Sequence, residues 1–600
     1  MSEVSPVDGI DLPSIQESEA RLQAIGARMG DRMADVGGSL PEWWERRAEK
    51  AGDRPLIKRD THSLSYREFD ALTRRIAARG HALGIGTGDT IAISLPACAA
   101  FLALVLGLSR LGARFSLLST GLRGRSLRHA LEEVPSTHLF TDPSGDRAVA
   151  DLDGFASPPR IVLDLENGGG AWLPDSGLTG VEDWLEGNAS SVPPTAPPRP
   201  ADETLFYIFT SGTTGLPKAT QCSHRRYIAG GTSEGALLDL QPDDCMYVVL
   251  PMFHIAALSA IGAALSSEAS LVIRPRFSAS RFWDDVRRFD ATAIQYLGEI
   301  LRYLLAQPPS ANDRPNPLRA MIGAGLSARV WRAFVERFGP IEIVESYGSS
   351  EGVIGLINLD QVPGSVGRPA PDVAARLRIV RLDPDTEEPI RDASDGLVLC
   401  DEGESGELIS RLEERSEFEG YSSAKATASK LIDDAFEKGD LWYRSGDRFR
   451  CRSGFYFFVS RLGDTFRWKG ENVSAQEVAR ALEAQSGVAH ATVYAVRVPE
   501  HEGAAGMAMI ALDAGASFDP AGLVSGLGRE LPPHALPLFL RVGDGRSVLT
   551  ETYKLGVAAL KRQGYDSALV PDPLYLLDTD AREYVPLSHD RLTAAGIRLP

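Results

Sequence analysis

A short run of hydroxyl residues and glycines, followed by a lysine, is the stretch of this sequence best suited to bind an anion. It consists of Thr210, Ser211, Gly212, Thr213, Thr214 and Gly215. Glycine lets the backbone turn its N–H groups inward, and the hydroxyls add further donors. Lys218 follows closely and could reach the same anion as a point charge. This composition favours polyphosphate binding; the alternative is a polar hairpin turn with an incidental lysine.

An apolar run at residues 205–209 precedes this stretch and predicts a buried strand that positions it. The stretch is not a Walker A loop, which has four residues between its glycines and a lysine directly after the second. Here two residues separate Gly212 from Gly215, and Ala219 follows Lys218.

Residues 207–220, YIFTSGTTGLPKAT, resemble the phosphate-loop signature of the adenylate-forming superfamily, which comprises acyl-CoA synthetases, adenylation domains and luciferases. The resemblance implies that ATP, Mg²⁺ and coenzyme A are used. It also implies that Thr210 and Lys218 take part in catalysis.

A second polar stretch, from Tyr347 to Glu351, follows a predicted strand. An aromatic ring beside a glycine can stack on a base, and a carboxylate can hold Mg²⁺; the alternative is an ordinary turn at a strand end. The stretch is similar to the YGxTE motif of the same superfamily, with Ser350 in place of threonine. The resemblance implies that Tyr347 lines the adenine, Ser350 contacts the α-phosphate and Glu351 binds Mg²⁺.

Further nucleotide contacts are implied around these two motifs. The implied set adds Ser346, Gly348, Ser349, Gly323, Ala324 and Gly325. Small residues at the last three positions would let a planar base lie on the backbone, although they also suit a tight turn between a strand and a helix.

Two residues further along the chain are candidates for holding the ribose. Asp447 lies in the stretch YRSGD, where a carboxylate behind a glycine turn could accept two ribose hydroxyls. The resemblance adds Arg461 as a second ribose contact, followed by a hinge at Gly463 and Asp464.

Lys554 and His254 are the remaining catalytic candidates. An isolated lysine in an acidic protein is usually a solvated surface residue, but the superfamily places its catalytic lysine in this setting. The resemblance therefore implies that Lys554 bridges the attacking oxyanion and the α-phosphate, where positioned cations stabilise charge. His254 lies among apolar residues, and either a packed core residue or a residue bordering the acyl site fits that position.

Three stretches indicate one branch of the superfamily: residues 277–286, residues 464–473, and the tail at 572–577 with 584–587. Together they resemble the fatty-acid transport protein and very-long-chain acyl-CoA synthetase branch. That branch has an aromatic residue and an asparagine where this chain has Ser346 and Val353. These departures count against a plain long-chain fatty acid as substrate, but not against ATP.

Composition argues against several other classes of protein. A net charge of −18 argues against nucleic-acid binding. Five scattered cysteines predict neither a disulfide framework nor a zinc site, and they suit a reducing, cytoplasmic compartment. The uncharged run at residues 91–108 contains Pro96, so we expect a buried strand, a turn and a buried helix instead of a membrane span. The sequence leaves a homodimer and peripheral membrane contact open.

The 600 residues exceed a single core, and strands alternate with helices between residues 89 and 140. We therefore expect an α/β protein whose large N-terminal domain holds doubly wound sheets and a β subdomain, followed by a small mobile α+β lid. The expected boundaries are a lead at 1–38, an adenylation core at 39–462 and a lid at 463–600.

Three functions remain open. The first is an ATP-dependent ligase that joins a carboxylic acid to coenzyme A through an acyl adenylate. The second is an adenylate-forming enzyme that activates an unusual acid, such as an aryl acid or nitrite for diazotisation, without coenzyme A. The third is a non-catalytic lipid carrier, which the four residues Lys218, Glu351, Asp447 and Lys554 argue against.

Overall fold

The computed structural model describes most of the chain. The described residues are 12–34, 36–59, 63–165, 176–186, 199–211, 217–348, 352–383, 386–413, 418, 421, 427–462, 465–468, 471–499, 504–513, 515–543, 557–595 and 597. The chain divides into two compact units: residues 13–363 with 415–429, and residues 1–12 with 364–414 and 430–600. We refer to these as the N-terminal and the C-terminal unit.

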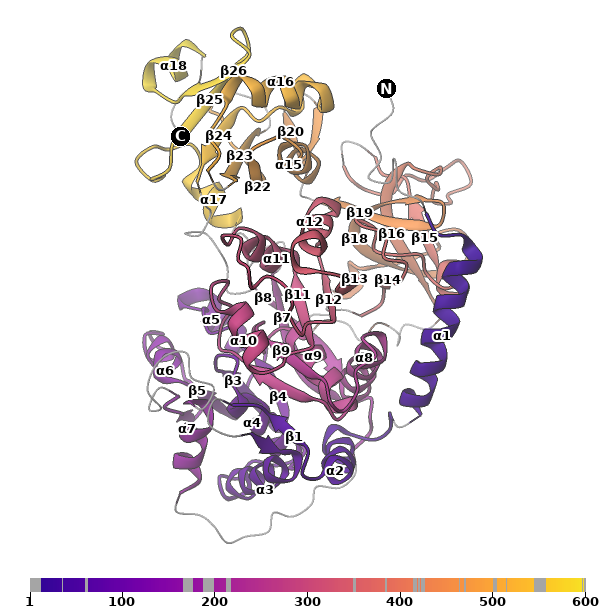
Figure 1. Cartoon of the computed structure of the whole chain (residues 1–600), viewed down its shortest axis with the longest axis vertical. Helices are drawn as coiled ribbons and strands as arrows, with labels where there is room; N and C mark the ends of the chain where they lie inside the picture. The colour runs from indigo at the N-terminus through magenta and orange to yellow at the C-terminus, as the bar shows by residue number, and fades with distance from the viewer. Residues whose placement is uncertain are drawn as a thin grey trace. The chain divides into compact units, whose positions relative to one another are not determined.

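The N-terminal unit contains an eight-stranded sheet and a six-stranded sheet, both mainly parallel (Figure 1). The larger sheet has the order β14-β13-β12-β11-β9-β10-β1-β2. Its strands are β1 (Pro55–Ile57), β2 (Leu64–Ser65), β9 (Cys245–Val248), β10 (Ser270–Ile273), β11 (Ala293–Leu297), β12 (Ala320–Ala324), β13 (Glu342–Gly348) and β14 (Gly355–Asn358). The antiparallel pairs β1–β2 and β13–β14 close its two edges.

The smaller sheet has the order β6-β5-β3-β4-β7-β8 and only its last pair is antiparallel. Its strands are β3 (Thr90–Ser94), β4 (Arg114–Leu117), β5 (His138–Thr141), β6 (Arg160–Val162), β7 (Thr204–Ser211) and β8 (Pro217–Ser223). Parallel neighbours need crossover connections, and helices supply them.

Twelve helices belong to the described part of this unit: α1 (Ile15–Met33), α2 (Leu40–Ala51), α3 (Tyr66–Ala82), α4 (Ala99–Ser109), α5 (Gly124–Glu133), α6 (Pro143–Ala150), α7 (Ser176–Leu185), α8 (His224–Leu237), α9 (Ile255–Ser266), α10 (Phe282–Arg288), α11 (Gly298–Leu305) and α12 (Ala328–Phe338). At the start of α2, Ser39 and Glu42 form a capping box, and a proline lies in the first turn.

The uncharged run at residues 91–108 folds as predicted, into a buried strand and a buried helix. β3 and α4 are buried at every position. A helix that is apolar all round belongs in a protein core when the neighbouring elements cover it, and α4 packs against α2, α3 and α7. Within the described part of the chain, no helix combines the length and the apolar character needed to cross a membrane.

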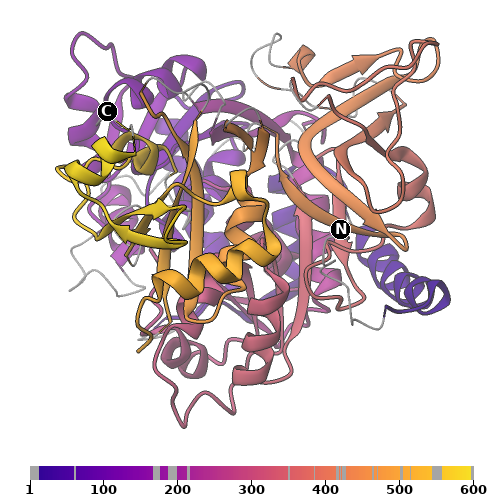
Figure 2. The ribbon, with the colours of Figure 1, turned by 90° about the horizontal axis from the view of Figure 1, so that it is seen from above.

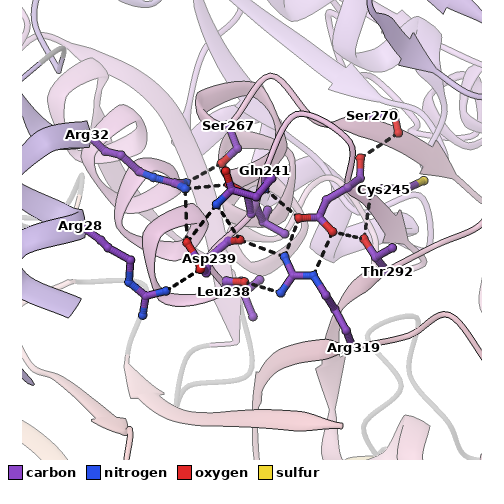
Figure 3. A network of polar contacts seen from close by, with 12 residues as sticks. Arg28, Arg32, Leu238, Asp239, Gln241, Cys245, Ser267, Ser270, Thr292 and Arg319 are labelled. Carbon is purple, nitrogen blue, oxygen red and sulfur yellow. Dashed lines mark hydrogen bonds and ion pairs between the residues drawn. The ribbon is translucent and has the colours of Figure 1, made fainter. Parts of the chain in front are cut away.

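A polar network fixes the loop between α8 and β9 and ties α1 to it (Figure 3). Arg28 on α1 pairs with Asp239 at 2.9 Å. Arg319 donates to the carbonyl of Asp239 at 2.9 Å and to a carboxylate oxygen of Asp244 at 3.0 Å. Because Asp244 precedes β9 and Arg319 precedes β12, the network holds the beginnings of two parallel strands in register. The opposite ends of such strands carry the candidate site.

The C-terminal unit contains the expected β subdomain. Its five-stranded sheet has the order β15-β16-β18-β17, with β19 paired to β18. The elements are α13 (Pro371–Arg376), β15 (Leu377–Val380), β16 (Ser405–Leu412), β17 (Leu431–Asp433), β18 (Leu441–Arg452) and β19 (Phe455–Arg461).

The rest of this unit is an α+β part with a sheet of its own (orange to yellow in Figure 2). A hairpin, β20 (Thr465–Trp468) and β21 (Glu471–Ser474), precedes the five-stranded sheet β22-β23-β24-β25-β26. Those strands are β22 (Val488–Val496), β23 (Ala505–Leu512), β24 (Phe539–Val542), β25 (Leu574–Asp578) and β26 (Glu583–Pro586). The helices are α15 (Ala475–Glu483), α16 (Pro520–Glu530), the 3₁₀ turn η2 (Pro533–Ala535), α17 (Val557–Gln563) and α18 (His589–Ala594). The predicted α/β fold class is confirmed.

Candidate active site

The predicted phosphate loop joins the antiparallel strands β7 and β8. Thr210 on β7 lies opposite Lys218 on β8, and Ser211 lies opposite Pro217. The strand predicted before the loop is confirmed. Gly212, Thr213, Thr214 and Gly215 lie outside the described residues. The described backbone therefore brings Thr210 and Lys218 side by side at the base of the loop.

The Tyr347 motif belongs to the hairpin of β13 and β14. Ser346, Tyr347 and Gly348 end β13, and Gly348 pairs with Gly355 at the start of β14. Ser349, Ser350 and Glu351 fall between these strands and outside the described residues. The motif thus lies at an edge of the larger sheet, at the carboxyl end of a strand. Ligands of open α/β sheets bind at such ends.

Arg226 connects the phosphate-loop hairpin to the Tyr347 motif. It lies in the first turn of α8, where its backbone N–H donates to the side chain of the N-cap Ser223. Its guanidinium donates to the carbonyl of Gln221 on β8 at 2.9 Å. The same guanidinium packs against Gly352, so closely that a Cβ on that glycine would lie 2.6 Å from Arg226 Nε. Sequence reasoning missed Arg226; its place in the first turn after β8 was the available signal.

The Gly323-Ala324-Gly325 stretch is the end of β12 and the turn after it. Gly325 has a φ of +84°, a conformation that favours glycine. The hydroxyl of Ser346 on the neighbouring β13 donates to the carbonyl of Gly323 at 2.8 Å. The structure therefore places this turn directly beside the Tyr347 motif, as a shared nucleotide site requires.

Asp447 and Arg461, the two predicted ribose contacts, are partners across β18 and β19. They occupy paired positions of the two strands. Their side chains form an ion pair of 3.8 Å, with Asp447 largely buried and Arg461 mostly exposed. The guanidinium places a positive charge beside the Asp447 carboxylate, and a carboxylate can accept hydrogen bonds from two hydroxyls.

His254 is the N-cap residue of α9. Its Nδ1 accepts the backbone N–H of Ala256 at 3.3 Å, so the neutral ring carries its proton on Nε2. The side chain is only partly buried. The capping bond explains a histidine at this position on structural grounds, and it leaves Nε2 as the polar atom of the ring that can act as a donor.

Several predicted groups cannot be placed. Lys554, the hinge residues Gly463 and Asp464, and the proposed Mg²⁺ ligand Glu351 lie outside the described residues. Among the residues that are described, no group of three or more histidine, cysteine or acidic side chains could hold a metal ion. All five cysteines are described, and none of them forms a disulfide.

Two buried side chains near the turn after β12 were also missed from the sequence. Tyr296 on β11 and Glu345 on β13 are both buried, and the tyrosine hydroxyl donates to the carboxylate. A charged residue within the apolar strand Ile343-Val344-Glu345 was the signal that could have drawn attention to this pair.

Comparisons with known proteins agree with the motif reading. A family model described as AMP-binding enzyme matches residues 44–421. A medium/long-chain-fatty-acid–CoA ligase, FadD6 of Mycobacterium tuberculosis, is 39% identical and covers 91% of this chain and 89% of its own. Long-chain fatty acid transport protein 2 of Rattus norvegicus is 35% identical over 90% of this chain and 88% of its own.

A solved structure supports the fold. The crystal structure of ATP-bound MatB from Rhodopseudomonas palustris superposes with a TM-score of 0.70, covering 87% of this chain and 99% of that one at 21% identity. The two sequence motifs and the hairpins that carry them indicate the same family as the model match over residues 44–421. The chain therefore belongs to the family of AMP-binding enzymes, as its resemblance to the adenylate-forming superfamily implied.

Proposed function

We propose that this AMP-binding enzyme activates a carboxylic acid with ATP and transfers the acyl group to coenzyme A, releasing pyrophosphate and AMP. The acid is a fatty or related acid. The acid's carboxylate oxygen attacks the α-phosphorus, the bond to pyrophosphate breaks, and the thiol of coenzyme A then displaces AMP from the carbonyl carbon. Two displacements replace one difficult condensation.

One observation carries the proposal: Arg226 lies between the strand that follows the phosphate loop and Gly352, which follows the Tyr347 motif. The two stretches are more than a hundred residues apart in the sequence, and the fold brings them to one arginine, as binding of a shared ligand would require. A guanidinium between them adds positive charge where a triphosphate would lie. The relatives named above are similar over nearly the whole chain, which supports the ligase reading.

Each residue implied in nucleotide binding has a separate role. Lys218 faces the β- and γ-phosphates from β8, and Asp447, oriented by Arg461, accepts the ribose hydroxyls. Glu351 would hold Mg²⁺, which when bound with ATP neutralises phosphate charge. Lys554 neutralises charge between the attacking oxygen and the α-phosphate, and the C-terminal part from residue 463 carries it in and out by turning about Gly463 and Asp464.

Lys554→Ala should therefore lower acid-dependent pyrophosphate release by about a thousandfold or more, since one positioned cation at the transition state is worth several kcal/mol. Transfer from chemically prepared acyl adenylate to coenzyme A should change far less. Both rates are measured on the same preparation, with Lys561→Ala on α17 as a control that leaves both unchanged. Equal losses in the two half-reactions would contradict the assigned role.

A second candidate function keeps the adenylate and changes the acid or the acceptor. The observation that favours it is Ser346, a small residue whose hydroxyl is bound to the carbonyl of Gly323. An aromatic ring at that position would be larger than serine, and we infer that the smaller side chain suits a different acid. An aryl acid, or nitrite without coenzyme A, would then be activated.

The two candidate functions are distinguished by measuring pyrophosphate release with fatty acids, aryl acids and nitrite, each with and without coenzyme A. Turnover with a fatty acid that yields its coenzyme A thioester supports the first function. Turnover confined to an aryl acid or nitrite, with no thioester formed, supports the second. A chain that binds fatty acid but releases no pyrophosphate with any acid would be the non-catalytic carrier.

A further inference from the structure

Three neighbouring parallel strands place Tyr296, Gly323 and Glu345 in one row. Tyr296 on β11 pairs with Gly323 on β12, and Gly323 pairs with Glu345 on β13. Residues in such a row face the same side of a sheet. Gly323 has no side chain, and a Cβ there would lie 2.7 Å from the Tyr296 ring. The glycine therefore gives the tyrosine room to reach across β12, where its hydroxyl donates to Glu345 Oε2.

The other oxygen of Glu345 holds the turn after β12. Oε1 accepts the backbone N–H of Gly325 at 2.7 Å and that of Leu326 at 3.0 Å. Gly298 lies against the same turn, since a Cβ there would lie 2.0 Å from the Gly325 carbonyl oxygen. The turn is thus held by a side chain from β13 and packed closely against the start of α11.

Burial of the Glu345 carboxyl costs desolvation free energy. Glu345 is 3% exposed and Tyr296 is fully buried. Burial raises the pKa of Glu345 to about 8, while the bonds from Tyr296 and the two backbone N–H groups act in the opposite direction. An apolar side chain would avoid the desolvation but could not accept two backbone N–H groups. The carboxyl is therefore explained by what it holds.

We propose that Glu345 is a positioning residue of the nucleotide site, which holds the Gly323-Ala324-Gly325 turn in the shape that receives the adenine of ATP. The inference rests on the proposed function, because it takes this turn to be the adenine contact. Glu345 itself does not touch the nucleotide. Tyr296 assists by binding the second oxygen, and Gly323 by leaving room for the tyrosine ring.

Glu345→Ala should weaken AMP binding, measured by calorimetry, by about tenfold or more, because two hydrogen bonds to the turn are lost together. The KM for ATP should rise by a similar factor, while the KM for the acid stays within about twofold. Glu345→Gln should restore both values, since its Oε1 accepts the two N–H groups and its amide donates to the Tyr296 oxygen. A folded Glu345→Ala that binds AMP with the wild-type Kd would overturn the proposal.

Glu234 on α8 provides a matched control. It is also a buried carboxyl of the N-terminal unit with a pKa raised by burial, but it holds no turn at the site. Glu234→Ala should leave the Kd for AMP unchanged. A loss of AMP binding equal to that of Glu345→Ala would mean that any buried cavity disturbs the site, which would overturn the positioning role.

The variant Tyr296→Phe tests the positioning role of Glu345 if Glu345→Ala does not fold. It keeps the ring over Gly323 and removes only one donor to Glu345. AMP binding about threefold weaker supports the proposal, and the wild-type Kd overturns it. Because AMP binding needs no turnover, a chain that binds AMP but releases no pyrophosphate would contradict the proposed function while leaving this comparison intact.

Discussion

Gly352 shows at the scale of one residue how close packing constrains the site. Its φ of +71° favours glycine, and the Arg226 guanidinium fills the space where a side chain would begin. Gly355, three residues on, has no positive φ and no neighbour within 4 Å of a Cβ. Of these two glycines in one hairpin, Gly355 therefore has room for a side chain and Gly352 does not.

Gly352→Ala should lower kcat/KM for acid-dependent pyrophosphate release by about tenfold or more, because both the backbone and Arg226 must shift. Gly355→Ala should stay within about twofold of wild type. Both are measured by pyrophosphate release, with circular dichroism to verify folding. Equal activities of the two variants would mean that the contact with Arg226 is unimportant.

Glu234, at the same scale, should make stability depend on pH. It is 7% exposed on α8, its Oε1 has no hydrogen-bond partner among the described residues, and burial raises its pKa to about 8. Between pH 4.5, near the pKa of the unfolded chain, and pH 8 the folded state keeps a proton that the unfolded state has released. The free energy of unfolding therefore falls as the pH rises through this window, by up to about 1.4 kcal/mol per pH unit from this residue.

Glu234→Gln should remove that part of the slope, as measured by urea unfolding at several pH values from 5 to 8. Glu345 contributes a slope of the same sign in both proteins, so the comparison is the difference between them. Glu132→Gln, at an exposed position of α5, should keep the wild-type slope. A Glu234→Gln slope that matches wild type would show that this carboxyl titrates normally.

At the scale of elements, α8 and α9 pack with their backbones nearly in contact. A Cβ on Gly231 of α8 would lie 2.6 Å from the Cα of Gly262 on α9. Gly230 has nothing within 4 Å. These helices follow the phosphate-loop hairpin and His254 respectively, so their spacing sets the distance between two parts of the candidate site.

Gly231→Ala should lower the free energy of unfolding by about 2–4 kcal/mol, because the helices must separate to admit a methyl group. Gly230→Ala should raise it by up to about 1 kcal/mol, because alanine is the better helix former at an unobstructed position. Denaturant unfolding of the two variants measures both. Similar values for the adjacent glycines would contradict the close packing.

At the scale of the whole molecule, the C-terminal part has a core of its own. The cluster of buried residues that includes Phe466, Leu482, Met507 and Leu540 runs from Phe466 to Ile597 and contains no residue from before position 466. A core of this size with its own five-stranded sheet is enough for independent folding. The division at residue 463, on which the proposed mobility of Lys554 depends, would separate this core from the β subdomain of the same unit.

The fragment 463–600 expressed alone should therefore unfold in one cooperative thermal transition and show near-ultraviolet circular dichroism. The fragment 430–600, which adds three strands of the β subdomain, is the matched comparison. A fragment 463–600 without a cooperative transition would place the boundary elsewhere and weaken the proposed movement.

The sequence predicted the elements of the α/β core well, because each signal was local. Apolar runs identified β3, α4 and β7 to within a few residues. The phosphate loop and the Tyr347 motif were also recognised, since their residues are contiguous. What the sequence could not predict were Arg226, Tyr296 and Glu345, whose roles depend on partners far along the chain.

The sequence by itself determined the α/β fold class, because hydrophobic periodicity specifies local structure. It also indicated an AMP-binding enzyme, because its contiguous motifs resemble those of the adenylate-forming superfamily. Only the tertiary structure decided that Arg226 packs on Gly352, that Tyr296 crosses Gly323, and that Glu345 holds the turn after β12. Strand order and register bring these residues together, and both arise from packing across crossover connections that no local pattern records.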